Sequence, residues 1–125
     1  MIFMKKIMIL LFLFLGACSQ QNATPVGKIY QSDIDGIRTS IAFHPDGNFS
    51  GTMINSYFGL FRLKNQSIHL DLQGTTMMAG TPNEMEAEKQ YFHNLDKINT
   101  IQIKENHLIL KGPDFEYIFV QSNSD

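Results

Sequence analysis

The sequence predicts a mainly β domain with one α-helix, arranged as a curved antiparallel sheet or as a β-roll that forms a partial barrel. Short segments in which apolar and polar residues alternate recur at close intervals between residues 28 and 121. The pairs Asp35-Gly36 and Asp46-Gly47 lie between them and can supply the positive φ of tight hairpin turns. A single stretch that begins at Thr81 has helical spacing instead.

Residues 1–17 have the layout of a secretory signal peptide. Lys5 and Lys6 precede the unbroken apolar run 7–15, and the small residues Gly16 and Ala17 follow it. A transmembrane helix needs about 20 apolar residues, so this run is too short to be a permanent anchor. We therefore expect an export signal that is removed from the mature chain.

Cys18 is the expected site of lipid attachment. The tetrapeptide Leu15-Gly16-Ala17-Cys18 resembles the lipobox of bacterial lipoproteins, in which the cysteine sulfur receives a diacylglyceryl group. Several acyl chains, such as palmitate, would hold the protein firmly on a membrane. Because Ser19 is not aspartate, we expect the outer membrane, facing the periplasm. The alternative is an ordinary signal peptide that leaves Cys18 unmodified.

The mature chain has the size and charge of one small acidic domain. Removing residues 1–17 leaves 108 residues, with eight basic against twelve acidic side chains and a formal charge of −4. This charge does not favour nucleic-acid binding. Cys18 is the only cysteine, so the domain must fold without a disulfide. We expect a monomer with a polar, flexible tether over 18–26, a domain over 27–121 and a frayed end over 122–125.

The expected elements follow in order along the domain. The helix starts with Thr81 as N-cap, Pro82 at its first position and Glu84 completing a capping box. It runs from Pro82 to about Leu95 and should pack its Met85, Phe92 and Leu95 side against one end of the sheet. The expected strands are residues 28–31, 38–43, 48–54, 60–63, 67–72, 100–104, 107–111 and 116–121.

The order of these pieces resembles the META domain family, to which HslJ-like bacterial lipoproteins belong. The resemblance covers roughly residues 27–120. It is carried by the run 46–51, by Asn55 with Gly59 and Phe61, by 76–79, by Glu88 with Phe92 and Leu95, and by 108–110. It implies a mainly β domain and a binding or stress-related role in the envelope.

This sequence departs from the family pattern at several positions, and the amino-terminal Trp often seen in the family is missing. Family members commonly carry a cysteine where Ile54 stands and another where Gly80 stands. If the two positions face each other, apolar packing around Ile54 replaces a disulfide worth about 2 to 4 kcal/mol. Met77 occupies the place of a characteristic arginine, so a role that depends on that cation is not implied here.

Few residues suggest a catalytic or metal-binding site. His44, His69, His93 and His107 lie on different expected elements without the spacing of a metal clamp, so we expect no metal and no cofactor. His69 and Asp71 share one face of a strand near Ser67, which leaves a hydrolase as an alternative. A solvent-facing polar strand explains them more simply. The acidic residues Glu84, Glu86 and Glu88 are read as a solvated helix face.

Two apolar groups raise the question of a binding surface. Met53, Met77, Met78 and Met85 could line an adaptable groove, but we expect them to fill the core. Tyr57 and Phe58 are neighbours that cannot both point inward, so this pair is the candidate partner contact. The sequence thus favours a non-enzymatic envelope lipoprotein with an unknown envelope protein or ligand as its partner. A small protein inhibitor or assembly accessory that uses the exposed aromatic is the second hypothesis, and the hydrolase is the third.

Overall fold

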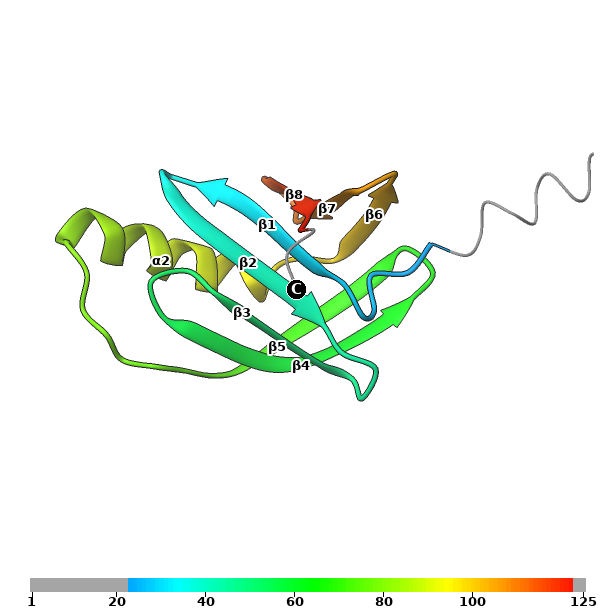
Figure 1. Cartoon of the computed structure of the whole chain (residues 1–125), viewed down its shortest axis with the longest axis horizontal. Helices are drawn as coiled ribbons and strands as arrows, with labels where there is room; N and C mark the ends of the chain where they lie inside the picture. The colour runs from blue at the N-terminus through cyan, green and yellow to red at the C-terminus, as the bar shows by residue number, and fades with distance from the viewer. Residues whose placement is uncertain (1–22, 123–125) are drawn as a thin grey trace, which may run out of the picture.

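In the computed structural model of the protein, residues 23–122 are described. The expected signal peptide, Cys18 and residues 123–125 lie outside this range, as does most of the expected tether. The described chain forms eight antiparallel strands in a closed barrel, ordered as in the sequence, and one helix (Figure 1). The strands are β1 Ile29–Ile34, β2 Ile37–Phe43, β3 Asn48–Thr52, β4 Ser56–Lys64, β5 Ser67–Thr75, β6 Thr100–Lys104, β7 His107–Lys111 and β8 Glu116–Gln121. The predicted fold class is confirmed.

Tight turns join β1 to β2, β4 to β5 and β6 to β7. Asp35 and Gly36 both have positive φ, 54° and 81°, as the predicted β1–β2 hairpin requires. Asn65 and Glu105 adopt similar values, 57° and 56°, in the β4–β5 and β6–β7 turns. Because each connection is short, every strand from β1 to β5 pairs with its sequence neighbour.

The barrel closes between β8 and β1 and is weakest between β5 and β6. Tyr30 pairs with Gln121 and Gln31 with Val120, so the last strand lies beside the first. β5 and β6 share only one residue pair, Ser67 with Thr100. Helix α2, Pro82–Leu95, lies between these two strands in the sequence and contacts β5. Its Tyr91 ring packs against Tyr57 of β4 and Tyr117 of β8, so the helix covers aromatic side chains of the barrel.

The helix has the predicted bounds and N-terminus but not the predicted buried face. The Glu84 amide donates to Thr81 Oγ1 (3.2 Å) and the Thr81 amide donates to Glu84 Oε1 (2.9 Å), which completes the capping box. Leu95 is buried and Phe92 partly buried, as expected, but Met85 is half exposed. The expectation for Met85 was wrong because the first turn of α2, residues 82–86, is exposed throughout.

The core consists of large side chains that alternate along the strands. Phe43, Phe49, Leu70, Leu108 and Phe119 are fully buried inside the barrel. Before β1, Pro25 is already buried and Val26 forms a bridge with Phe43, while the Gly27 amide donates to the Phe43 carbonyl (2.8 Å). The packed chain therefore begins at Pro25, two residues before the boundary expected from the sequence.

Candidate functional site

A buried polar junction connects helix α2 to the loop between β3 and β4. Glu88 is only 6% exposed, and its carboxylate accepts hydrogen bonds from the Ile54 amide (2.9 Å), the Asn55 amide (2.6 Å) and Asn55 Nδ2 (2.7 Å). The reading of Glu88 as part of a solvated helix face was therefore wrong. Three donors converge on this side chain, so burial leaves its carboxylate well hydrogen-bonded.

Asn55 also forms hydrogen bonds with the segment that precedes the helix. Its Oδ1 accepts from Thr76 Oγ1 (2.9 Å) and from the Met78 amide (2.5 Å), and its Nδ2 also donates to the Met78 carbonyl (3.2 Å). The amide group thus uses two donors and two acceptor positions, which is its full capacity. Such a saturated buried network fixes the position of three chain segments.

Tyr57 lies inside the barrel and is not available as a contact. Its side chain is 1% exposed, and its hydroxyl donates to the Ser40 carbonyl (2.7 Å). The Tyr91 hydroxyl lies 2.6 Å away; because Tyr57 has given its proton to a carbonyl, Tyr91 is the donor in this pair. Burial raises the pKa of both phenols above the ordinary value. The part of the partner-contact prediction that rests on Tyr57 was therefore wrong.

Phe58 faces the other way and is 56% exposed, as the alternation along β4 requires. It lies opposite Gly74 of β5, where a Cβ would come within 2.8 Å of its ring, so the ring covers the bare backbone of Gly74. It also borders a shallow groove of about 590 Å³ on the outside of the barrel. Small side chains such as Ala42, Ser50 and Thr75 form part of its lining.

The His69 and Asp71 side chains do not form a catalytic pair within the described chain. Both are exposed on the outer face of β5, and no hydrogen bond joins them. Asp71 Oδ2 instead accepts from Gln73 Nε2 (2.9 Å). The geometry matches a solvent-facing polar strand and gives no support to the hydrolase alternative.

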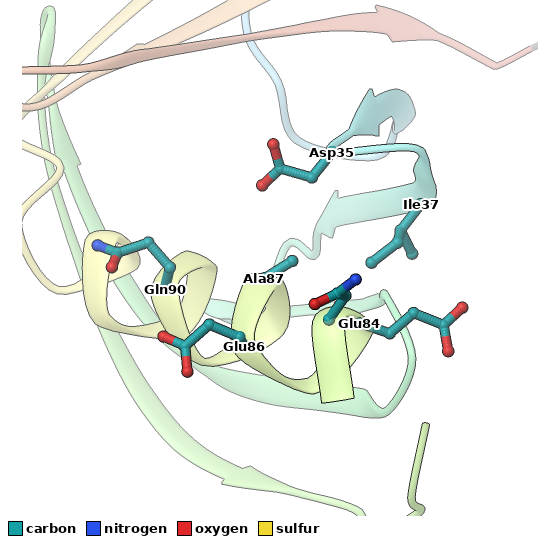
Figure 2. Close-up of a pocket in the computed structure, with 7 residues that line it drawn as sticks. Asp35, Ile37, Glu84, Glu86, Ala87 and Gln90 are labelled. Carbon is teal, nitrogen blue, oxygen red and sulfur yellow. The ribbon is translucent and has the colours of Figure 1, made fainter. Parts of the chain in front are cut away.

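An acidic cleft that the sequence did not predict lies between the β1–β2 turn and the first turns of α2. Figure 2 shows Asp35 on that turn, above the helix that carries Glu84 and Glu86, whose side chains point away from one another. Ile37 and Ala87 supply the apolar part of this cleft of about 420 Å³. Within residues 23–122, no group of histidine, cysteine or acidic side chains is arranged to hold a metal ion.

Three of the four methionines expected in the core are on the surface. Met53 is 6% exposed, but Met77 is 94% exposed, and Met78 and Met85 are about half exposed or more. That expectation was wrong because Met77 and Met78 belong to a strandless segment between β5 and α2. The Asn55 side chain binds this segment through its backbone at Met78, which leaves the methionine side chains outside.

Ile54 and Gly80 do face each other. A Cβ placed on Gly80 would lie 3.3 Å from Ile54 Cδ1, so the isoleucine side chain reaches the glycine directly.

The described segments contain no helix long and apolar enough to cross a membrane.

Comparison with known proteins identifies the domain but no curated relative. The family model of the META domain matches residues 26–124. No curated protein matches the chain. A crystal structure of a DUF4847 family protein from Bacteroides vulgatus superposes with a TM-score of 0.53 at 20% identity, over 70% of this chain and 61% of that chain. This chain therefore spans less than two thirds of that protein. An NMR structure of a protein from Burkholderia xenovorans gives a TM-score of 0.58 at 18% identity, over 80% of this chain and 85% of that one.

Proposed function

Because the chain belongs to the META domain family, we propose that it is a lipid-anchored protein of the bacterial envelope whose domain binds a partner rather than catalyses a reaction. The observation that carries the proposal is the position of Cys18. This only cysteine directly follows the apolar leader and stands five residues before Ala23, where the described chain begins. A lipid there would tether the domain to the outer membrane on its periplasmic side.

Two features support binding as the mode of action. The buried polar side chains of the described domain, Thr39, Asn55 and Glu88, all have hydrogen-bond partners within the protein, so none of them needs a substrate as a partner. Exposed apolar side chains such as Phe58 and Met77 are available on the surface instead. An accessory role in a periplasmic stress response agrees with both.

Mass spectrometry of the native product tests the lipid anchor. The full chain is expressed in a Gram-negative host, and its N-terminal peptide is analysed beside that of Cys18→Ser. We expect the wild type to begin at residue 18 with an acylated sulfur and to fractionate with membranes, and the variant to lose both properties. An unmodified thiol, or a retained leader, would contradict the anchor.

A second candidate function is a small inhibitor or assembly accessory that docks through an exposed aromatic. Phe58 favours it, since the ring stands above small side chains at the edge of a groove. Aromatic side chains in such positions commonly contribute most to binding at interfaces.

A photo-crosslinking amino acid at position 58 tests this candidate in intact cells. Arg62 is the matched control position, because it is exposed on the same strand and the same outer face. We expect one discrete adduct from position 58 and none from position 62. An excess of the wild-type protein, expressed in the same cells, should compete for the partner and abolish the adduct. Identical adducts from both positions would refute a docking site at Phe58.

A further inference from the structure

The barrel has two distinct ends, and the chain enters at only one of them. Ala23 and Pro25 border a cavity of about 590 Å³ together with Leu63, Asn65 and Ile101, beside the β4–β5 turn. The β2–β3 and β6–β7 turns lie at this same end, as the antiparallel registers require and as Figure 1 shows on its right. We name it the tether end.

The opposite end carries different elements. It holds the β1–β2 turn with Asp35, the loop before β4 and the N-terminus of α2, which lie on the left of Figure 1. The acidic cleft of Asp35, Glu84 and Glu86 is therefore at this far end. β4 has nine residues, which corresponds to roughly 30 Å of strand, or about 23 Å along the axis of a barrel whose strands tilt by about 40°.

The distance from Cys18 to the tether end is short. Five residue steps separate Cys18 from Ala23, and a fully extended chain covers at most about 3.6 Å per residue, so the sulfur lies within about 18 Å of Ala23 plus one side chain. This reach is smaller than the length of the barrel. A lipid on Cys18 therefore cannot bring the far end to the bilayer as closely as the tether end without the domain lying on its side.

The charges act in the same direction. Lys28, Lys64 and Lys104 flank the tether end and outnumber the acids of its turns, Asp46 and Glu105. The far end presents the carboxylates that line the cleft. An anionic bilayer surface attracts lysines and repels carboxylates within about 10 Å at moderate salt.

We propose that the tether end is the membrane-facing surface of the domain, with an anionic phospholipid bilayer as its partner, and that the acidic cleft points away from it. The inference rests on the proposed lipid at Cys18. The far end is then directed away from the bilayer.

Isoleucine methyl NMR in nanodiscs tests the orientation. The chain that begins at Cys18 is coupled through its only thiol to a maleimide phospholipid and inserted into nanodiscs that contain phosphatidylglycerol and a nitroxide lipid. Ile103 and Ile29 report on the tether end, and Ile37 and Ile54 on the far end. We expect most of the Ile103 and Ile29 signal to be lost and most of the Ile37 and Ile54 signal to be kept.

Two controls separate the causes. Because the lipid is attached chemically, this result does not depend on whether cells acylate Cys18, which the mass spectrometry above decides. Inserting about 20 Gly and Ser residues before Ala23 lengthens the reach beyond the barrel and should weaken the contrast between the two ends. Equal losses at both ends, or a larger loss at Ile37, with the native spacing before Ala23 would overturn the proposal.

Discussion

The carboxylate of Glu88 accepts hydrogen bonds from both the backbone amide and the side-chain amide of Asn55, at 2.6 and 2.7 Å. The two residues are 33 positions apart and belong to α2 and the β3–β4 loop. This pairing is what orients the helix, because Glu88 lies on the same buried face as Tyr91 and Leu95. The helix is thus held by a polar contact at one end of that face and by apolar packing at the other.

Replacing Glu88 by Gln should destabilise the domain by about 2 to 3 kcal/mol. The substitution turns one acceptor atom into a donor that meets the donors of Ile54 or Asn55, so at least one buried group loses its partner. The free energy of unfolding in urea measures the effect. Glu86→Gln on the exposed face is the control and should stay within about 0.5 kcal/mol of wild type. Equal effects of the two substitutions would contradict the buried role of Glu88.

The stability of the domain should fall above pH 10 because of Tyr57 and Tyr91. Burial raises the pKa of both phenols in the folded state, whereas the unfolded chain ionises near the ordinary value of about 10. Below that pH both states hold the protons, so the contribution to stability is complete. Above it only the unfolded chain releases them, and the free energy of unfolding falls by up to about 1.4 kcal/mol per pH unit for each phenol.

Urea unfolding at a series of alkaline pH values measures this slope. Tyr91→Phe removes one phenol and keeps the ring, so the slope should become shallower while stability at neutral pH falls by only about 1 kcal/mol. An unchanged slope in Tyr91→Phe would show that this phenol ionises equally in the folded and unfolded states.

Gly51→Ala should cost at least about 2 kcal/mol. A Cβ at Gly51 would collide with the Ser40 carbonyl and with the Tyr57 ring inside the barrel, where neither group can move freely. Gly74→Ala is a matched control, because its Cβ would meet only the ring of Phe58, which is half exposed and can swing outward. Thermal or urea unfolding of both variants compares them. A Gly74→Ala cost as large as that of Gly51→Ala would count against this explanation.

The double variant Ile54→Cys and Gly80→Cys should form a disulfide. The isoleucine side chain already reaches the position of a Cβ on Gly80, and the bond would close a loop of 27 residues from position 54 to 80. Chain entropy then predicts a gain of about 3.5 kcal/mol in the oxidised protein over the reduced one. In a Cys18→Ser background, thiol titration and unfolding with and without reductant measure bond formation and stability. Two free thiols after oxidation would contradict the expected geometry.

Most elements could be predicted because local chemistry specifies them. The capping box at Thr81, the Asp35-Gly36 turn and the β6 to β8 hairpins appear where the sequence places them, since caps and tight turns depend on a few adjacent residues. β4 and β5 extend further than expected, to Ser56–Lys64 and Ser67–Thr75. Pairing between long neighbouring strands supplied the extra hydrogen bonds that their sequences alone do not indicate.

Side-chain environment was harder to predict than element position. Alternation shows that Tyr57 and Phe58 face opposite ways but not which one is inside. The bare backbone of Gly51 leaves the room that the buried Tyr57 ring occupies. The local signal for the burial of Glu88 is its helical spacing from Tyr91 and Leu95, but an acid near the start of a helix is ordinarily explained by the dipole. Its place beside Glu84 and Glu86 concealed that it meets the β3–β4 loop.

By itself, the sequence determined the mainly β class, the single helix with its bounds, and the position of the only cysteine shortly after an apolar run. These features depend on periodicity, turn residues and short motifs, which act over a few residues. Only the tertiary structure decided that Asn55 meets Glu88, that Met77 stays outside, and that the acidic cleft lies at the end opposite Ala23. Those outcomes depend on which distant segments the closed barrel brings together, and that closure is a property of the whole chain.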